Sequence, residues 1–234
     1  MNSRWISFFF SIFLTLYING QEQYCEKYPL ECNLSLDFLV SHKPDLDSVS
    51  KQVQLPVHFI YSIVAPEITQ YNFIRNKLES YTLNVLYVQN GRAYADYSIG
   101  FFQMKPSFIE DMEKYIQQNA MLSKKYSKHL FLNPMNKNSR IGRVKRLNSI
   151  HWQIKYLGMF CDIMKDKFRT VHFSNQEGKL KFYASAYNSG FKNNENFIRE
   201  MQNKAYFPRF SIKKFNYSDL SYWFFNECRG LFNK

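Results

Sequence analysis

The chain has 234 residues, 18% of them aromatic, and a formal net charge of +12. This length is enough for one well-buried domain or for a domain with a small appendage. A strongly basic chain suits a negatively charged partner, but no nucleic-acid-binding signature accompanies the charge, so we expect no nucleic-acid partner. The five His residues are scattered and no Cys-x-x-Cys pair occurs, which predicts no metal site and no cofactor.

The first residues have the pattern of a secretory signal peptide. Arg4 supplies a positive charge, and the run from Trp5 to Ile18 contains neither acid nor base. The run has about 14 residues, fewer than the roughly 20 that a membrane-spanning helix needs. We therefore predict a signal peptide over residues 1–20, a periplasmic or secreted location, and no stable membrane span after cleavage. For an exported basic protein, cell-wall polymers are the expected anionic partner.

An exported chain meets an oxidising compartment, in which its four cysteines can form disulfides. Two of them, Cys25 and Cys32, are close enough in sequence to close a small loop, and Cys161 lies in an apolar helical stretch. With Cys228, four cysteines allow three full pairings, and the sequence leaves the choice among them open.

Residues 21–55 are polar and contain prolines, which predicts a loop-rich N-terminal arm with one short helix. Pro56 then opens an apolar stretch, and a proline is well tolerated in a first helical turn. We expect a buried helix there that runs into Glu67. Pro66 removes a backbone donor and is expected to kink or end this helix, which would aim the acid into a cleft.

Residues 71–89 form a second predicted helix, which ends at Asn90-Gly91. Apolar residues recur in it at three- and four-residue steps, which predicts one apolar face turned toward the core. They are Phe73, Ile74, Leu78, Tyr81, Val85 and Leu86.

The second half of the chain continues the helical pattern. A loop over residues 94–105 is followed by helices over 107–123, 147–168 and 180–189, with a polar, basic linker to about residue 145 between the first two. Gly190 is the expected C-terminal cap of the last of these helices. The basic stretch 137–146 has the pattern of a solvated face or a contact with anionic wall components. In the tail, Tyr222-Trp223-Phe224-Phe225 is expected to pack back onto the body.

Three short stretches occur in a fixed order: Ala65-Pro66-Glu67, then Ser98 to Pro106, then Ala186-Tyr187-Asn188-Ser189-Gly190. This order resembles the lytic transglycosylases and goose-type lysozymes, which cut the glycan strands of peptidoglycan. The resemblance spans roughly residues 57–191. It implies a mainly α, lysozyme-like α+β fold, in which a two-lobed helical domain over residues 56–234, with a C-terminal extension, surrounds a central glycan-binding cleft.

The same resemblance implies a function: a peptidoglycan lytic transglycosylase acting on the β-1,4 bond between N-acetylmuramic acid and N-acetylglucosamine, with a 1,6-anhydro product. Glu67 would be the single general acid and base. Burial among apolar neighbours would raise the pKa of this carboxyl toward the working pH. The implied substrate-binding residues are Ser98, Gly100, Phe101, Phe102, Gln103, Tyr187 and Asn188. In a further matching stretch, Ser149 to Leu157, the family glycine is replaced by Gln153.

Several alternatives remain open. Gly100 follows Glu67 by 33 residues, a longer path than the family usually has, and the predicted helix over 71–89 accounts for the excess. Glu79 lies in that helix at a spacing nearer to that of the family and is the alternative catalytic acid. Asp96, if it held a water, would make the enzyme a hydrolytic lysozyme; otherwise it is a turn residue. The chain can also be a non-catalytic peptidoglycan-binding or cell-wall assembly protein, or a basic interaction protein with chance matches.

Overall fold

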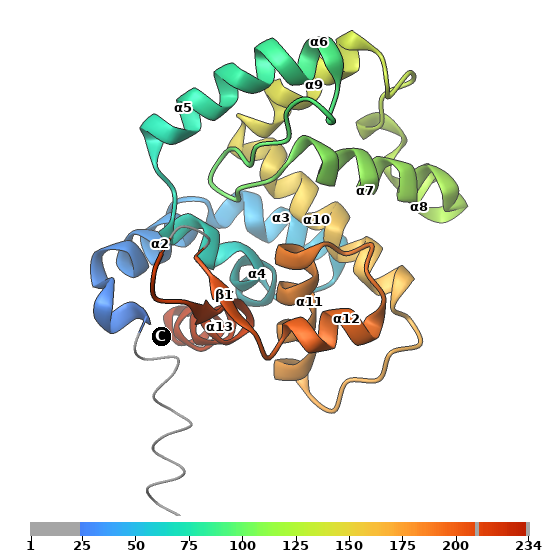
Figure 1. Ribbon diagram of the computed structural model, residues 1–234. Coiled ribbons are helices and arrows are strands. Elements are labelled where there is room, and N and C mark those ends of the chain that lie inside the picture. The colour runs from blue at the N-terminus through green and yellow to red at the C-terminus, as the bar shows by residue number, and fades with distance from the viewer. Residues whose placement is uncertain (1–23, 209–210, 233–234) are drawn as a thin grey trace, which may run out of the picture.

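The computed structural model describes residues 24–208 and 211–232, and it is mainly helical, which confirms the predicted class (Figure 1). The predicted signal peptide lies outside the described residues. The first elements are α2 (Pro29–Ser41), α3 (Lys43–Val53), α4 (Val57–Thr69), α5 (Phe73–Thr82), the π-helical turn η1 (Leu83–Tyr87), α6 (Val88–Asn90), α7 (Pro106–Gln118) and α8 (Ala120–Tyr126). They are followed by the 3₁₀ turn η2 (Ser127–His129), α9 (Lys137–Leu147), α10 (Ile150–Lys167), α11 (Gln176–Ser189), α12 (Glu195–Met201), the strands β1 (Ala205–Phe207) and β2 (Phe215–Asn216), and α13 (Tyr217–Phe232).

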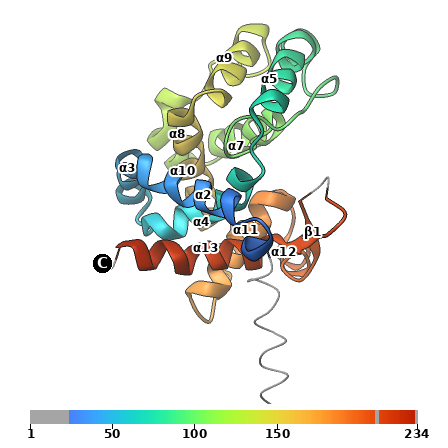
Figure 2. The same cartoon turned by 90° about the vertical axis from the view of Figure 1, so that its left-hand side faces the viewer.

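Helix α4 is the centre of the lower part of the molecule. Its side chains are apolar all round and nearly all buried, which is typical of a helix enclosed by others. Helices α2, α3, α11 and α13 pack against it, and we call α2, α3, α4, α11 and α13 the lower group (Figures 1 and 2). The aromatic tail contributes to this packing as expected, because Phe224 and Phe225 on α13 are buried.

The region from α5 to α9 stands above this layer, and we call it the upper group (Figure 2). Helix α10 joins the two groups, since it contacts α3 and α4 below and α7, α8 and α9 above. Two strands, β1 and β2, form a small antiparallel hairpin beside α13.

The N-terminal segment is helical rather than loop-rich, which corrects our expectation for residues 21–55. Pro29 is the first residue of α2, and Pro44 is the second residue of α3. A missing backbone donor costs nothing at these positions, because the first N–H groups of a helix have no partner within it. The prolines thus mark helix starts. The Cys25–Cys32 disulfide links the segment before α2 to the first turn of that helix, as the sequence had allowed, while Cys161 and Cys228 are free and buried.

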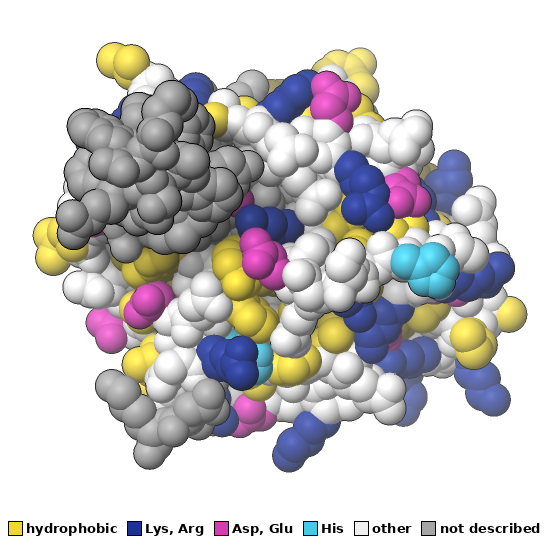
Figure 3. Space-filling model, turned by 90° about the horizontal axis from the view of Figure 1, so that it is seen from below, with side chains coloured by type: hydrophobic (Ala, Val, Ile, Leu, Met, Phe, Trp, Pro, Cys, Tyr) yellow, Lys and Arg dark blue, Asp and Glu magenta, His cyan; other side chains and the backbone are white. Residues whose placement is uncertain are grey.

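The end of α8, the turn η2 and most of α9 lie in the segment 124–145, where we expected a linker. The side chain of Asn136 caps α9 by accepting from the N–H of Ser139 at 2.8 Å. The arginines of α9 point into the fold rather than forming a solvated face: Arg140 Nε donates to the Val88 carbonyl at 2.9 Å, and Arg146 Nη1 donates to the His129 carbonyl at 2.6 Å. On the face seen from below, Lys and Arg side chains are scattered among Asp and Glu side chains (Figure 3).

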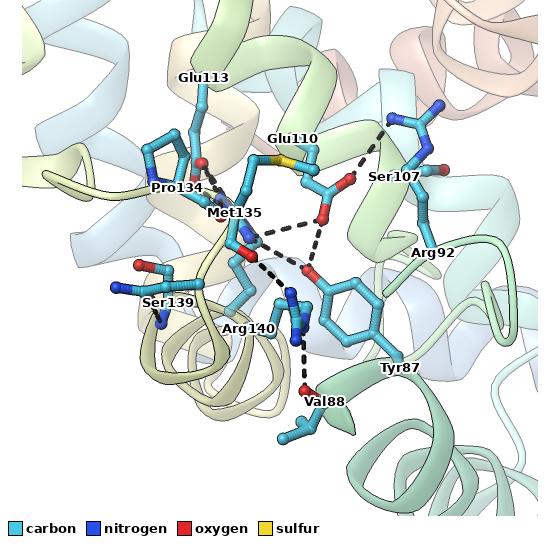
Figure 4. Close-up of polar contacts among 12 residues, drawn as sticks. Tyr87, Val88, Arg92, Ser107, Glu110, Glu113, Pro134, Met135, Ser139 and Arg140 are labelled. Atoms are coloured by element: carbon cyan, nitrogen blue, oxygen red, sulfur yellow. Dashed lines mark hydrogen bonds and ion pairs between the residues drawn. The ribbon is translucent and has the colours of Figure 1, made fainter. Parts of the chain in front are cut away.

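The third arginine of this stretch, Arg143, is the centre of a buried ionic network between α7, α9 and η1. Figure 4 shows its partners Tyr87, Glu110 and Glu113. Its guanidinium is fully buried and binds both carboxylate oxygens of Glu113, with Nη2 at 2.6 Å from Oε2. Nη1 donates to the hydroxyl of Tyr87 at 3.2 Å, and that hydroxyl donates to Glu110 Oε1 at 2.8 Å. Because these charges are removed from water, each needs its partner.

Helix α5 departs from the predicted packing. Its apolar residues are exposed (Ile74 by 71%, Leu78 by 64% and Tyr81 by 71%), and none of its residues is buried. Polar bonds hold it in place instead: Ser80 Oγ donates to Asn148 Oδ1 at 2.9 Å. Periodicity identified an apolar face, but it could not show that this face turns away from the core. Among the described helices, none is both long and apolar enough to cross a membrane.

We predict that Arg143→Met lowers the free energy of unfolding by about 3–5 kcal/mol, because it leaves the Glu113 carboxylate buried and unpaired. Urea denaturation measures this change. The control is Lys204→Met, which breaks an exposed pair with Glu200 and should cost less than ~1 kcal/mol. Equal losses in the two variants would show that the buried network contributes no more than a surface pair.

Candidate functional site

A cavity of about 720 Å³ lies between the upper and lower groups. Its wall takes residues from α4, α5, α7, α11, β1 and the loop that precedes α7. Among the lining residues are Glu67, Glu79, Asp96, Ser98, Gln103, Tyr187, Asn188 and Tyr206. The cavity therefore collects residues from all three of the sequence stretches that define the resemblance.

Glu67 lies in the last turn of α4 and is half-buried. Asn188 Nδ2 donates a hydrogen bond to Glu67 Oε1 at 2.9 Å, across a sequence separation of 121 residues. Helix α4 continues for three residues beyond Pro66. The helix therefore does not end before the acid, although Pro66 cannot donate to the carbonyl four residues back, at Ser62.

Burial raises the pKa of Glu67 from 4.5 to about 7, because the charged form loses hydration. Three groups oppose this rise. The amide of Asn188 donates to the carboxyl, the Tyr217 hydroxyl lies beside it, and the positive charge of Arg75 favours the ionised form. Burial outweighs all three, so the carboxyl holds its proton up to near-neutral pH.

The second stretch forms a tight hairpin turn. Ile99 and Met104 exchange two backbone hydrogen bonds of 3.1 Å, and Gly100 to Gln103 form the turn between them. Gly100 has φ +78°, a conformation that favours glycine. The Gln103 side chain lines the cavity, while its Nε2 donates to the Gly100 carbonyl at 2.7 Å.

Two residues outside the turn hold it. Gln153 on α10 accepts from the Phe102 N–H at 2.8 Å and donates to the Leu147 carbonyl at 2.7 Å. Asn76 on α5 accepts from the Gly100 N–H at 2.6 Å. Gln153 stands where the resembled family has a glycine, so this replacement has a structural role here: its amide bridges the turn to the end of α9.

Not every predicted substrate-binding residue reaches the cavity. Phe102 is fully buried, and the ring of Phe101 stacks on Tyr71 with centroids 4.2 Å apart. Together with Gly100 they are absent from the wall, so the expectation that these two rings line the site is not met. Tyr187 does reach the wall, but its hydroxyl donates to the Phe102 carbonyl at 2.6 Å rather than to Glu67.

The two alternative acids also line the cavity. Asp96 binds the start of α7, accepting from the Ser107 N–H at 2.9 Å and from the Ser107 hydroxyl at 2.6 Å. Glu79 projects from α5, and burial raises the pKa of its carboxyl while Arg75 opposes the rise. Glu67 thus differs from both acids in its direct bond to Asn188.

Sequence reasoning missed Tyr206 and Arg75. Tyr206 lies on β1, outside the stretch that carries the resemblance, and Arg75 lies on α5 between two of the apolar residues that marked that helix. No local signal distinguishes either residue, because both reach the cavity only through tertiary packing. Within residues 24–208 and 211–232, no group of three or more His, Cys, Asp or Glu side chains is placed to hold a metal ion.

Comparison with protein-family models, with curated proteins and with solved structures finds no match for this chain.

We predict that Gly100 and Gln153 are energetically coupled. A Cβ on Gly100 would lie 1.9 Å from Gln153 Nε2, so Gly100→Ala should cost at least ~1 kcal/mol less in a Gln153→Ala background than in the native chain. Urea denaturation of the four proteins gives the coupling. Gly91→Ala is the control, because nothing lies within 4 Å of its added Cβ and its cost should be equal in both backgrounds. Additive costs for Gly100→Ala would contradict the predicted clash.

We also predict that Glu67 makes stability depend on pH. Its pKa of about 7 in the folded chain exceeds the value of 4.5 that is ordinary for a glutamate, so the folded state binds the proton more tightly than the unfolded state. The resulting stabilisation is present below pH 4.5 and is lost as the pH rises through 7. The native chain should therefore lose ~2–3 kcal/mol of unfolding free energy between pH 4 and pH 8 that Glu67→Gln does not lose. Denaturation at both pH values tests this. Glu200→Gln, an exposed control, should lose as much as the native chain, and an equal loss in Glu67→Gln would refute the raised pKa.

Proposed function

We propose that this chain is a peptidoglycan lytic transglycosylase with Glu67 as its general acid and base. The observation that carries the proposal is the Glu67–Asn188 hydrogen bond in the wall of the cavity, because it unites the first and third stretches of the resemblance around a carboxyl that holds a proton near neutral pH. The position of the cavity between the upper and lower groups supports the finer proposal of a two-lobed domain with a central glycan cleft.

In the proposed reaction, protonated Glu67 gives its proton to the glycosidic oxygen as the bond to the anomeric carbon of the muramic sugar breaks. The 6-hydroxyl of the same sugar then attacks that carbon and gives its proton to Glu67. A carbon–oxygen bond is broken, another is formed, and no water is consumed. An internal nucleophile needs no second carboxylate, since it is already held near the anomeric carbon.

The hydrolytic alternative needs a second acid that holds a water. Both carboxylate oxygens of Asp96 accept from Ser107, which ties this acid to the start of α7 and favours the non-hydrolytic route. The export signal and the periplasmic or secreted location belong to the same proposal, because peptidoglycan lies outside the inner membrane.

The test is digestion of purified sacculi by the native chain and by Glu67→Gln, with mass analysis of the products. We expect 1,6-anhydro-muropeptides from the native chain, a loss of at least about 100-fold in rate for Glu67→Gln, and native activity falling as the pH rises above 7 because the acid must begin protonated. Glu227→Gln, an exposed carboxyl on α13, is the matched control and should retain full activity.

Every other outcome of this digestion supports a different alternative. Reducing ends would replace the lyase with a lysozyme that uses Asp96. Intact sacculi that nevertheless bind the protein would leave the non-catalytic wall-binding alternative. Full activity in Glu67→Gln would remove Glu67 from the mechanism and make Glu79 the next acid to test.

A further inference from the structure

Two polar atoms in the cavity lack the hydrogen bonds that buried groups normally have. Glu79 Oε2 and the Tyr206 hydroxyl are buried, and neither has a hydrogen-bond partner among the described residues. Both residues line the cavity that contains Glu67. Leaving a buried donor or acceptor unpaired is costly, so such atoms are rare in folded proteins and each one calls for an explanation.

The two atoms come from different parts of the fold. Glu79 belongs to α5 of the upper group, whereas Tyr206 belongs to β1 beside the lower group (Figure 1). Glu67 interacts electrostatically with Tyr206, and Arg75 interacts with both Glu67 and Glu79. Electrostatic interactions therefore connect Glu79 to Glu67 through Arg75, and Glu67 to Tyr206.

This arrangement sets the chemistry of a ligand. An ionised carboxylate only accepts hydrogen bonds, so the ligand must offer a donor to Glu79, such as a sugar hydroxyl or an acetamido N–H. A tyrosine hydroxyl both donates and accepts, so it can bind an acetamido carbonyl or another hydroxyl. An N-acetylated glycan carries all of these groups at short intervals along its length.

We propose that Glu79 Oε2 and the Tyr206 hydroxyl are glycan-binding groups, which contact the sugars on the two sides of Glu67. Helix α5, the insertion that lengthens the path from Glu67 to the hairpin turn, then has a defined role: it carries one of these contacts. The proposal rests on the proposed function only for the class of ligand, because binding requires no cleavage.

The experiment measures binding of N-acetylglucosamine tetrasaccharide by isothermal titration calorimetry, with the full chain carrying Glu67→Gln to prevent turnover. In this background Tyr206→Phe should raise Kd by about 2- to 10-fold, and Glu79→Met should raise it by about 10-fold or more. Neither change removes a hydrogen bond between described residues. Tyr206→Phe should therefore leave Tm unchanged, and Glu79→Met should lower it only by the loss of the attraction between Glu79 and Arg75. A residue with a purely structural role would lower Tm when its polar group is removed, so weaker binding at an unchanged Tm indicates a direct contact with the glycan.

Two matched controls lie outside the cavity. Tyr81→Phe alters a tyrosine on α5 that is 71% exposed, and Glu227→Met alters an exposed carboxyl on α13. Both should leave Kd unchanged. The proposal is overturned if the tetrasaccharide does not bind, if Tyr206→Phe and Glu79→Met bind as tightly as the controls, or if Tyr206→Phe lowers Tm, which would reveal an internal partner of its hydroxyl.

The same set of proteins separates this proposal from the proposed function. If the two variants weaken binding but the native chain releases no muropeptides, the binding groups stand and the lyase activity fails. If the native chain releases anhydro-muropeptides while the variants keep the native Kd, the lyase stands and these contacts fail.

Discussion

The rest of the site depends on the balance between burial of the Glu67 carboxyl, which raises its pKa, and the hydrogen bond from Asn188, which lowers it. Burial favours the protonated acid, whereas the amide of Asn188, the Tyr217 hydroxyl and Arg75 favour the carboxylate. Because burial dominates only by a few pKa units, the group can both give and take a proton near neutral pH. Deeper burial would raise the pKa of this carboxyl until it no longer gave up its proton, and greater exposure to water would lower the pKa until it no longer held one.

Two sets of polar contacts hold the wall of the cavity around Glu67 in place. Behind the wall, the Arg143–Glu113 pair fixes α9 against α7, the helix that brings Ser107 and Phe108 to the cavity. At its edge, Asp111 of α7 pairs with Arg92 at 2.9 Å and with Lys192, in the segment after α11, at 2.8 Å. The second of these pairs links α7 to the lower group, which carries Glu67 and Asn188.

Helix α5 is held by polar bonds rather than by burial of apolar side chains. It buries none of its residues, yet Asn76 binds the hairpin turn, Ser80 binds Asn148 and Glu79 reaches the cavity. Its position therefore depends on directional polar bonds rather than on apolar packing. An element held in this way can place a carboxylate precisely while leaving its own apolar face in solvent, which explains why hydrophobic periodicity alone assigned that face to the core.

The sequence by itself determined the helical class, the start of α4 after Pro56, the end of α11 before Gly190, the Cys25–Cys32 spacing that permits a disulfide, and the acid and amide that meet in the cavity. These features follow from local rules, namely helical periodicity, proline and glycine at helix ends, and short motifs. The tertiary structure alone decided that Phe102 is buried, that Arg143 faces inward, that Gln153 supports the turn, and that Tyr206 joins the site. Each of these depends on contacts between residues far apart in the chain, and no local pattern encodes which of the available faces a folded neighbour will cover.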